Sequence, residues 1–238
     1  TAAILTLASC STTKYVPDGS YLLDEVRIHT DNKNVKPSNL SIYVRQNPNS
    51  KWFSLIKTQL YVYNWSGRDS TRWVNRALRR LGDAPVIYSK EETERSREEM
   101  TKAVQNMGYM GATVEYIPKI KKKKVKLAYK VNTGEPYIVR SLKYDVQDEK
   151  IWEYMQKDSA STYLSEGMYF NANILDSERQ RITGNLLRNG YYKFNKDYIS
   201  YTADTVRGTY QVDLTLHLAR YRQHSGAELQ DHPQYTIN

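Results

Sequence analysis

The sequence lacks the residues on which several classes of protein depend. One cysteine in 238 residues allows no internal disulfide framework and no thiolate metal cage. No two of the four histidines stand four residues apart, as a helical zinc site requires, and no Gly-x-Ser-x-Gly or phosphate-binding glycine loop occurs. A run of about 18 apolar residues is also missing, so we expect no membrane-spanning helix. These absences predict a protein that is not an enzyme and has no metal, no cofactor and no small-molecule substrate.

Positive charge and tyrosine are abundant instead. The chain has 35 Lys and Arg residues against 26 Asp and Glu residues, which gives a formal net charge of +9. It has 21 tyrosines but only 3 phenylalanines, and tyrosine suits half-exposed sheet faces better than a thick, dry core. Nucleic acid attracts basic proteins, but no base-stacking or groove-reading motif accompanies this charge. We therefore expect no nucleic-acid partner.

The first residues read as a processing signal. Residues 2–7 are small and apolar, like the end of the hydrophobic region of a signal peptide. Leu7-Ala8-Ser9-Cys10 then resembles a bacterial lipobox, in which the signal is cut before the cysteine and the thiol receives diacylglycerol. A buried free cysteine is the alternative. We expect lipidation of Cys10 and an anchor in outer-membrane lipid, since each buried CH₂ of an acyl chain contributes ~0.8 kcal/mol.

An internal repeat organises most of the chain. Gly108-Tyr109-Met110 aligns with Gly190-Tyr191-Tyr192 at a shift of 82 residues. Upstream of each glycine, apolar residues recur every four positions, as on one buried face of a helix: Met100 and Val104 in the first copy, Ile182 and Leu186 in the second. Glycine adopts positive φ at no cost, so each glycine fits the end of such a helix.

Strand-like runs surround both predicted helices. Runs with alternating or β-branched residues follow the glycines at 112–117 and 125–131, and at 198–201 and 210–218. Opening strands and first helices are predicted at 22–29 and 38–45, and at 138–146 and 149–156. The order β-α-α-β-β therefore occurs twice. It predicts an α+β fold in which helices cover one face of a mixed three-stranded sheet.

This order, with Gly-Tyr at the end of the second helix, resembles a POTRA domain, the periplasmic module of outer-membrane assembly proteins. Residues 134–139 (Gly-Glu-Pro-Tyr-Ile-Val) are similar to the segment that opens such domains, and residues 233–238 echo it. Together with the lipobox, residues 65–69 (Trp-Ser-Gly-Arg-Asp) and 82–86 (Gly-Asp-Ala-Pro-Val) resemble the TamL-like lipoproteins of Bacteroidetes, within the BamA/TamA superfamily. In that family the POTRA domains precede a membrane β-barrel, whose series of ~10-residue strands is absent from these residues.

The resemblance implies a domain plan of four segments. They are a truncated lipoprotein signal, lipobox and tether at 1–19, a first POTRA domain at 20–136 with an insertion at about 47–81 between its helices, a second POTRA domain at 137–220, and a linker with the start of a third at 221–238. Polar residues and Gly226 in 219–231 predict a linker that lets the third unit swing.

The resemblance also implies a function. We expect a non-catalytic periplasmic scaffold on a lipid-anchored outer-membrane protein, which serves outer-membrane protein assembly or envelope transport. Its partners would be a TamB-like inner-membrane-anchored protein and outer-membrane protein precursors. An exposed sheet edge accepts an extended client segment by β-augmentation. Two edges of the second domain are candidates, one at Leu142 and Tyr144 and the other at Ile199 and Tyr201, and the sequence leaves open which one is free.

Two basic segments have two interpretations each. Residues 69–81 read as an amphipathic helix that carries Arg72, Arg76, Arg79 and Arg80. Either its apolar stripe caps the sheet of its own domain, or the helix contacts a partner or a membrane. A hairpin tip consists of Lys121, Lys122, Lys123 and Lys124. It either discourages wrong edge pairing or contacts anionic headgroups. If these surfaces dominate, the protein is a lipid-surface adaptor or structural tether that handles no client strand.

Overall fold

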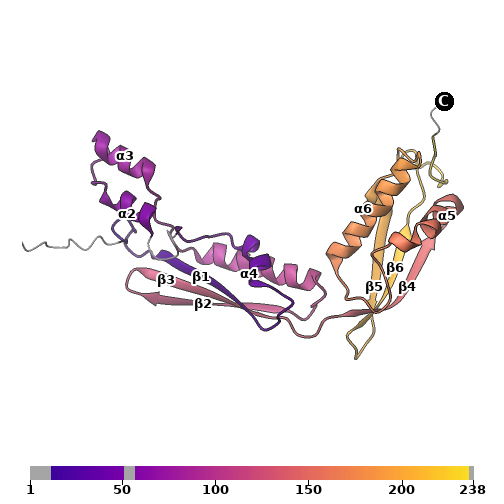
Figure 1. Cartoon of the computed structure of the whole chain (residues 1–238), viewed down its shortest axis with the longest axis horizontal. Helices are drawn as coiled ribbons and strands as arrows, with labels where there is room; N and C mark the ends of the chain where they lie inside the picture. Colours follow the sequence, from indigo (N-terminus) through magenta and orange to yellow (C-terminus); the bar gives the residue numbers. More distant parts are fainter. Residues whose placement is uncertain (1–11, 51–56, 236–238) are drawn as a thin grey trace, which may run out of the picture. The chain divides into compact units, whose positions relative to one another are not determined.

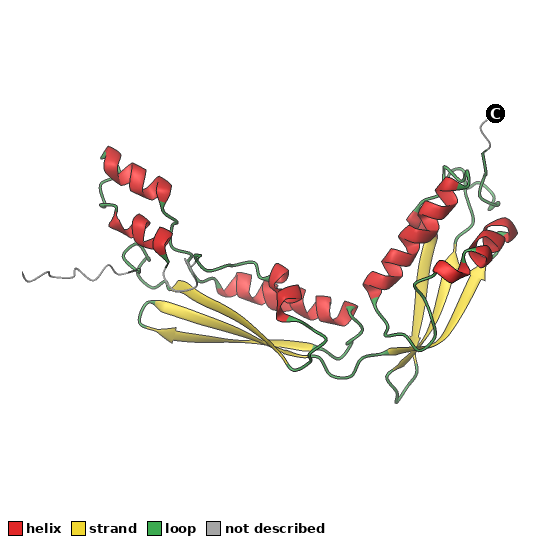
Figure 2. Ribbon diagram, in the orientation of Figure 1, coloured by secondary structure: helices red, strands yellow, loops and turns green. Residues whose placement is uncertain are grey.

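The computed structural model describes residues 12–50 and 57–235, which form two compact units (Figure 1). The first unit comprises the chain up to Ala103 together with Thr113–Asn132, and the second comprises Val104–Ala112 and the chain from Thr133. Each unit contains one three-stranded sheet with helices on one face (Figure 2). Cys10, the predicted lipidation site, lies outside the described residues.

In the first unit the predicted order is confirmed, with two further helices inserted. The strands are β1 (Leu22–Thr30), β2 (Thr113–Lys121) and β3 (Lys124–Asn132), and the helices are α1 (Pro37–Leu40), α2 (Thr58–Trp65), α3 (Trp73–Leu81) and α4 (Lys90–Asn106). The sheet order is β1-β3-β2, with β1 parallel and β2 antiparallel to β3. The first helix is shorter than the predicted 38–45, because a 3₁₀ turn follows at Ser41–Tyr43. There the Ser41 hydroxyl donates to the Ser38 carbonyl (2.7 Å), a bond that competes with helix continuation.

The second unit repeats the same topology without the insertion. Its elements are β4 (Ile138–Val146), α5 (Glu149–Lys157), α6 (Ala172–Arg188), β5 (Ile199–Thr205) and β6 (Gln211–Leu218). The sheet order is β4-β6-β5, again with a parallel opening strand and an antiparallel third strand. Even the irregularities recur, since the register of the opening strand shifts between Leu23 and Glu25 in one unit and between Val139 and Ser141 in the other. The internal repeat is therefore a repeat of structure.

The sequence signals that predicted the long helices are confirmed. All four apolar residues of the predicted stripes, Met100, Val104, Ile182 and Leu186, are buried. Gly108 and Gly190 follow α4 and α6 with φ of +98° and +90°. Glycine is needed at such positions because a side chain disfavours positive φ.

The segment after β6, where a linker is predicted, contacts the second unit near its two ends, at Tyr221 and His232, and the residues between them are mostly exposed. Tyr221 and Gln230 form an antiparallel bridge. His232 is buried, and its amide donates to the Asp148 carboxylate (2.8 Å), which also accepts the Ile151 amide as the N-cap of α5. The His232 ring lies 4.6 Å from the ring of Tyr198, and this aromatic contact buries apolar surface. The polar composition of the segment did not indicate this contact.

Candidate functional site

The outer edge of β4 is partly covered within its own unit. The Val139 amide donates to the carbonyl of Met168 (2.9 Å), and its carbonyl accepts from the Gly167 amide (2.8 Å). The amide of Leu142 donates to the carboxylate of Glu166 (3.2 Å). The β4 edge at Leu142 therefore already has hydrogen-bond partners.

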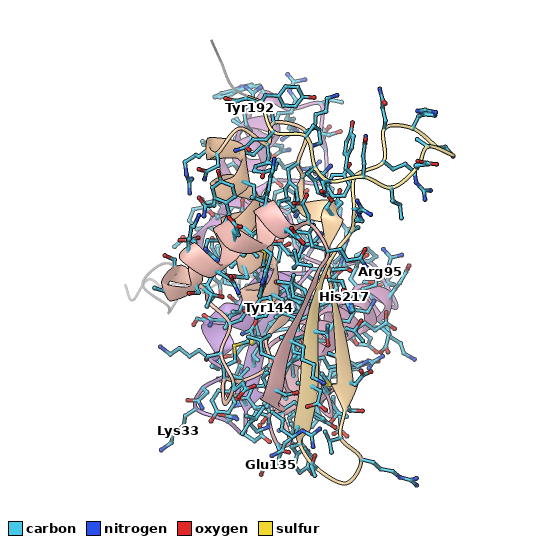
Figure 3. All side chains as sticks on the ribbon, turned by 90° about the vertical axis from the view of Figure 1, so that its right-hand side faces the viewer. Lys33, Arg95, Glu135, Tyr144, Tyr192 and His217 are labelled. Atoms are coloured by element: carbon cyan, nitrogen blue, oxygen red, sulfur yellow. The ribbon has the colours of Figure 1, made fainter. Side chains whose placement is uncertain are left out.

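Tyr144 extends from β4 toward the helices, whereas His217 lies toward the open face of the sheet (Figure 3). The Tyr144 ring packs 5.5 Å from that of Trp152, and burial raises the pKa of its hydroxyl. Its side chain therefore belongs to the core of the unit.

The edge formed by β5 is different. β5 pairs with β6 on one side, and no other segment in the described part of the chain pairs with its outer side. The Tyr198 carbonyl accepts from the Ala219 amide, and the Val206 amide donates to the Gln211 carbonyl, so even-numbered positions direct their backbone groups at β6. The odd-numbered positions consequently direct theirs outward. These are Ile199, Tyr201, Ala203 and Thr205.

A groove of about 420 Å³ lies between α6 and the start of this edge. Leu175 and Arg179 line it from α6, and Ile199 and Tyr201 line it from β5. The Tyr201 hydroxyl donates to the Leu175 carbonyl (3.2 Å), and burial raises the pKa of this hydroxyl. The floor of the groove is thus fixed, and the backbone of β5 stands beside it with unused donors and acceptors.

The two edges of the first sheet are less open. The first half of β1 is covered, because Leu23 donates to the Val86 carbonyl (2.8 Å) and Tyr88 donates to the Tyr21 carbonyl (2.8 Å). β2 contains Pro118, which has no amide hydrogen and interrupts the row of donors. β5 contains no proline, so among the described strands it offers the most continuous edge.

On the open face of the second sheet, the side chains of Asp145, His217 and Thr202 form a hydrogen-bonded row that the sequence did not indicate. His217 Nδ1 lies 2.9 Å from the Asp145 carboxylate, and its Nε2 lies 2.9 Å from Thr202 Oγ1. The order resembles that of a nucleophilic triad. However, the side chains of His217 and Asp145 are 35% and 55% exposed, so nothing shields a reaction from water. We interpret this row of side chains as a cross-strand ladder that joins all three strands of the sheet.

The arginine-bearing helix α3 does not cap the sheet, so that interpretation is wrong. Trp73 and Leu81 are 73% and 71% exposed, and Val74 is 45% exposed. The physical reason is that α3 is fixed to the α2–α3 corner by polar side chains. Arg79 Nη2 donates to the Gly67 carbonyl (2.9 Å), and Asn75 Oδ1 accepts from the Gly67 amide (2.7 Å).

The four lysines of the hairpin tip lie at the turn between β2 and β3, where Lys122 has a φ of +54°. Lys123 is held by Asp18 (2.8 Å) and by the Val16 carbonyl (3.2 Å). A cavity of about 620 Å³ brings this tip together with Tyr61 of α2 and with Thr12, the first described residue.

The part of the chain that the structure describes contains neither a membrane-spanning helix nor a cluster of metal-binding side chains. No helix there is long and apolar enough to cross a membrane. No group of three or more His, Cys, Asp and Glu side chains there is arranged to hold a metal ion.

Comparison with known proteins identifies the fold of the first unit. Residues 21–134 match the POTRA family model, described as a surface antigen variable number repeat. A search of curated proteins gives no match. Among solved structures, Haemophilus influenzae BamA POTRA3–5 is 14% identical over 86% of this chain and 99% of that chain, with a TM-score of 0.33. POTRA1–2 of the periplasmic domain of Omp85 from Anabaena is 12% identical over 85% and 98%, with a TM-score of 0.34.

Longer proteins also match. BamA from Haemophilus ducreyi lacking POTRA domains 1–3 is 18% identical over 83% of this chain, with a TM-score of 0.40, and the chain spans 29% of that protein's length. The second unit repeats the strand order and strand directions of the unit that the family model matches. The chain therefore has the α+β fold of tandem POTRA domains, with an insertion between the helices of the first.

Proposed function

We propose that the protein is a non-catalytic periplasmic scaffold, which binds extended segments of client or partner proteins in outer-membrane protein assembly or envelope transport. The observation that carries this proposal is the open edge of β5 beside the groove under α6. A peptide that adds a strand there would be held by backbone hydrogen bonds, which tolerate many sequences. Such tolerance suits a factor that serves many clients.

The resemblance described above supplies the finer assignments. The protein would be a TamL-like lipoprotein, anchored in the outer membrane through Cys10 with its POTRA domains in the periplasm. A TamB-like inner-membrane-anchored protein and outer-membrane protein precursors would be its partners. Residues 221–238 would lead into a third POTRA domain. The amide of Tyr235, which donates to the Gly190 carbonyl (2.9 Å), would fasten that entry to the end of α6.

A proline at an outward-facing position tests the edge directly. Ala203→Pro removes one outward amide and places a ring in the path of an added strand, while the ladder to β6 keeps its bonds. We expect peptides from unfolded barrel strands to bind the wild-type chain and to bind this variant at least 10-fold more weakly, as measured by fluorescence anisotropy.

Ala203→Thr is the matched control, because it keeps the amide and suits a strand. Circular dichroism would verify that both variants fold. Equal peptide affinity for Ala203→Pro and the wild type would contradict the edge as the binding site. High salt should change this affinity little, whereas binding that collapses with salt would instead favour the lipid-surface adaptor or structural tether.

A further inference from the structure

The first unit contains a helix whose amphipathic character is reversed. A helix on the surface of a globular protein normally directs its apolar face inward and its polar face to solvent. In α3 the apolar residues Trp73, Val74, Ala77 and Leu81 share an arc of about 100°, and three of them are exposed large hydrophobic side chains. No residue of α3 is buried.

Polar contacts hold this orientation in place. Arg79 donates to Gly67 and also to Ser66 Oγ (3.2 Å), and Asn75 Nδ2 donates to the Asp69 carbonyl (2.7 Å). Gly82 ends the helix against the backbone of α2, where a β-carbon would lie 2.4 Å from the Tyr63 nitrogen. The inward side of α3 is thus occupied by specific hydrogen bonds, and the apolar side remains outward. An exposed apolar face of this kind marks an interaction surface.

Positive charge lies along one side of the apolar face. Arg76 and Arg80 are exposed on α3 beside Trp73, and α3 itself contains no acidic residue. The lysine tip of the β2–β3 turn lies at the same end of the unit, since it shares a cavity with Tyr61 of α2 (Figure 1).

The N-terminal segment reaches the same end. Lys14 Nζ donates to the Ser66 carbonyl (2.7 Å), the Tyr15 hydroxyl donates to that same oxygen (2.5 Å), and Val16 is buried with Leu22 and Leu60. Thr12, two positions after Cys10 in the sequence, lines the cavity under the lysines. The exposed apolar helix, the basic tip and the first described residues therefore lie at the same end of the unit, which we call the basic end.

We infer that the basic end binds the surface of an anionic phospholipid bilayer, with the apolar face of α3 inserted at the level of the headgroups. Tryptophan prefers this interfacial depth, and arginines that flank an apolar face reach back to phosphate groups. Lysines near an anionic surface add attraction that does not require a shaped partner. This inference is independent of client binding at β5, and it does not require lipidation of Cys10.

Vesicle flotation with the Cys10→Ser chain tests this inference without any acyl anchor. We expect binding to vesicles of 70% phosphatidylethanolamine and 30% phosphatidylglycerol, and at least 10-fold weaker binding to pure phosphatidylcholine. The affinity for the anionic vesicles should fall at least 10-fold when salt rises from 50 to 500 mM, because salt screens exposed charges. Trp73→Ser with Leu81→Ser should lower the affinity at least 10-fold. Arg76→Glu with Arg80→Glu should do the same.

Lys33→Glu with Lys36→Glu is the matched control for net charge. These exposed lysines follow the end of β1 at Thr30, whereas the basic end lies where Leu22 pairs with Lys124. The control pair should reduce binding less than threefold. Equal losses in both charge variants, full binding by the serine variant, or no binding by the parent chain would each overturn the inference. Ala203→Pro should leave vesicle binding unchanged, so failure here is distinguishable from failure of the edge.

Discussion

Glu178 of α6 is a buried carboxylate, and its replacement by glutamine measures what holds the second unit together. Its side chain is 1% exposed. It accepts hydrogen bonds from Arg181 (2.9 and 2.7 Å), from the Thr162 hydroxyl (2.7 Å) and from the Tyr163 amide (3.0 Å). Arg181 also contacts the carboxylate of Asp158. One side chain thus joins α6 to the loop after α5.

Glu178→Gln keeps the shape but removes the charge and one acceptor. Breaking a buried ion pair costs about 3–5 kcal/mol when the remaining charge has no partner. Asp158 still neutralises Arg181 here, so we expect a loss of about 2–3 kcal/mol in the free energy of unfolding. For a unit of this size that is a fall in Tm of roughly 10–20 °C.

Urea unfolding followed by circular dichroism would measure the loss, and hydrogen exchange would locate it in α5 and α6. The matched control is Glu91→Gln in the exposed Glu91–Arg95 pair (2.6 Å), which should cost less than about 0.5 kcal/mol. A Glu178→Gln value as small as the control would refute the reasoning, since it would mean that desolvation of the ions cancels their attraction.

The same residue gives the second unit a pH dependence. Burial alone would raise the pKa of Glu178, but the hydrogen bonds from Arg181, Tyr163 and Thr162 outweigh it and hold the pKa below its ordinary value of 4.5. Folding therefore favours the ionised form. The contribution of Glu178 to the free energy of unfolding is fully present above pH 4.5, and it is lost as the pH falls through the lower pKa of the folded state. Glu178→Gln should flatten this acid limb of the stability curve.

Three further substitutions have defined outcomes. Gly82→Ala should disrupt the α2–α3 corner and increase hydrogen exchange there, because the new β-carbon meets the backbone of α2, whereas Gly111→Ala enters open space and should be neutral. Tyr191→Phe should be neutral or stabilising by up to about 1 kcal/mol in urea unfolding, since the buried hydroxyl has no partner among the described residues and burial raises its pKa to about 12. Asp148→Ala should lower the free energy of unfolding by about 1–3 kcal/mol and speed hydrogen exchange at residues 230–235. Asn171→Ala, at the N-cap of α6, is the control and should leave those residues protected.

The fold was predictable because local signals and the repeat agreed. The four-residue apolar spacing before Gly108 and Gly190, and the alternation along β3 and β6, each specify an element without reference to the rest of the chain. Agreement between two copies then fixed the order of the elements.

The open edge of β5 was predictable only in part. Ile199 and Tyr201 were named from their strand, but Ala203 and Thr205 were not. Their outward direction depends on which positions of β5 pair with β6, and the turn between Val206 and Gln211 sets that phase. Coverage of the β4 edge depends on Glu166 and Gly167, whose sequence shows no strand pattern.

The orientation of α3 was also outside the reach of the sequence. Its periodicity shows an apolar face and a basic face, but periodicity does not say which face a helix buries. The orientation of α3 is set by Asn75 and Arg79, whose side chains form hydrogen bonds with the backbone of Gly67. Such short-range polar contacts leave no periodic trace.

The parallel pairing of β1 with β3, and of β4 with β6, determines how each unit bears mechanical tension. The chain enters each unit through the opening strand and leaves the sheet through its central strand. Because these two strands run parallel, entry and exit lie at opposite ends of the ladder. A pull along the chain loads the hydrogen bonds of that ladder together in shear, whereas an antiparallel hairpin would open one bond at a time. Each unit, if pulled at its two chain ends, would therefore resist extension with many bonds at once.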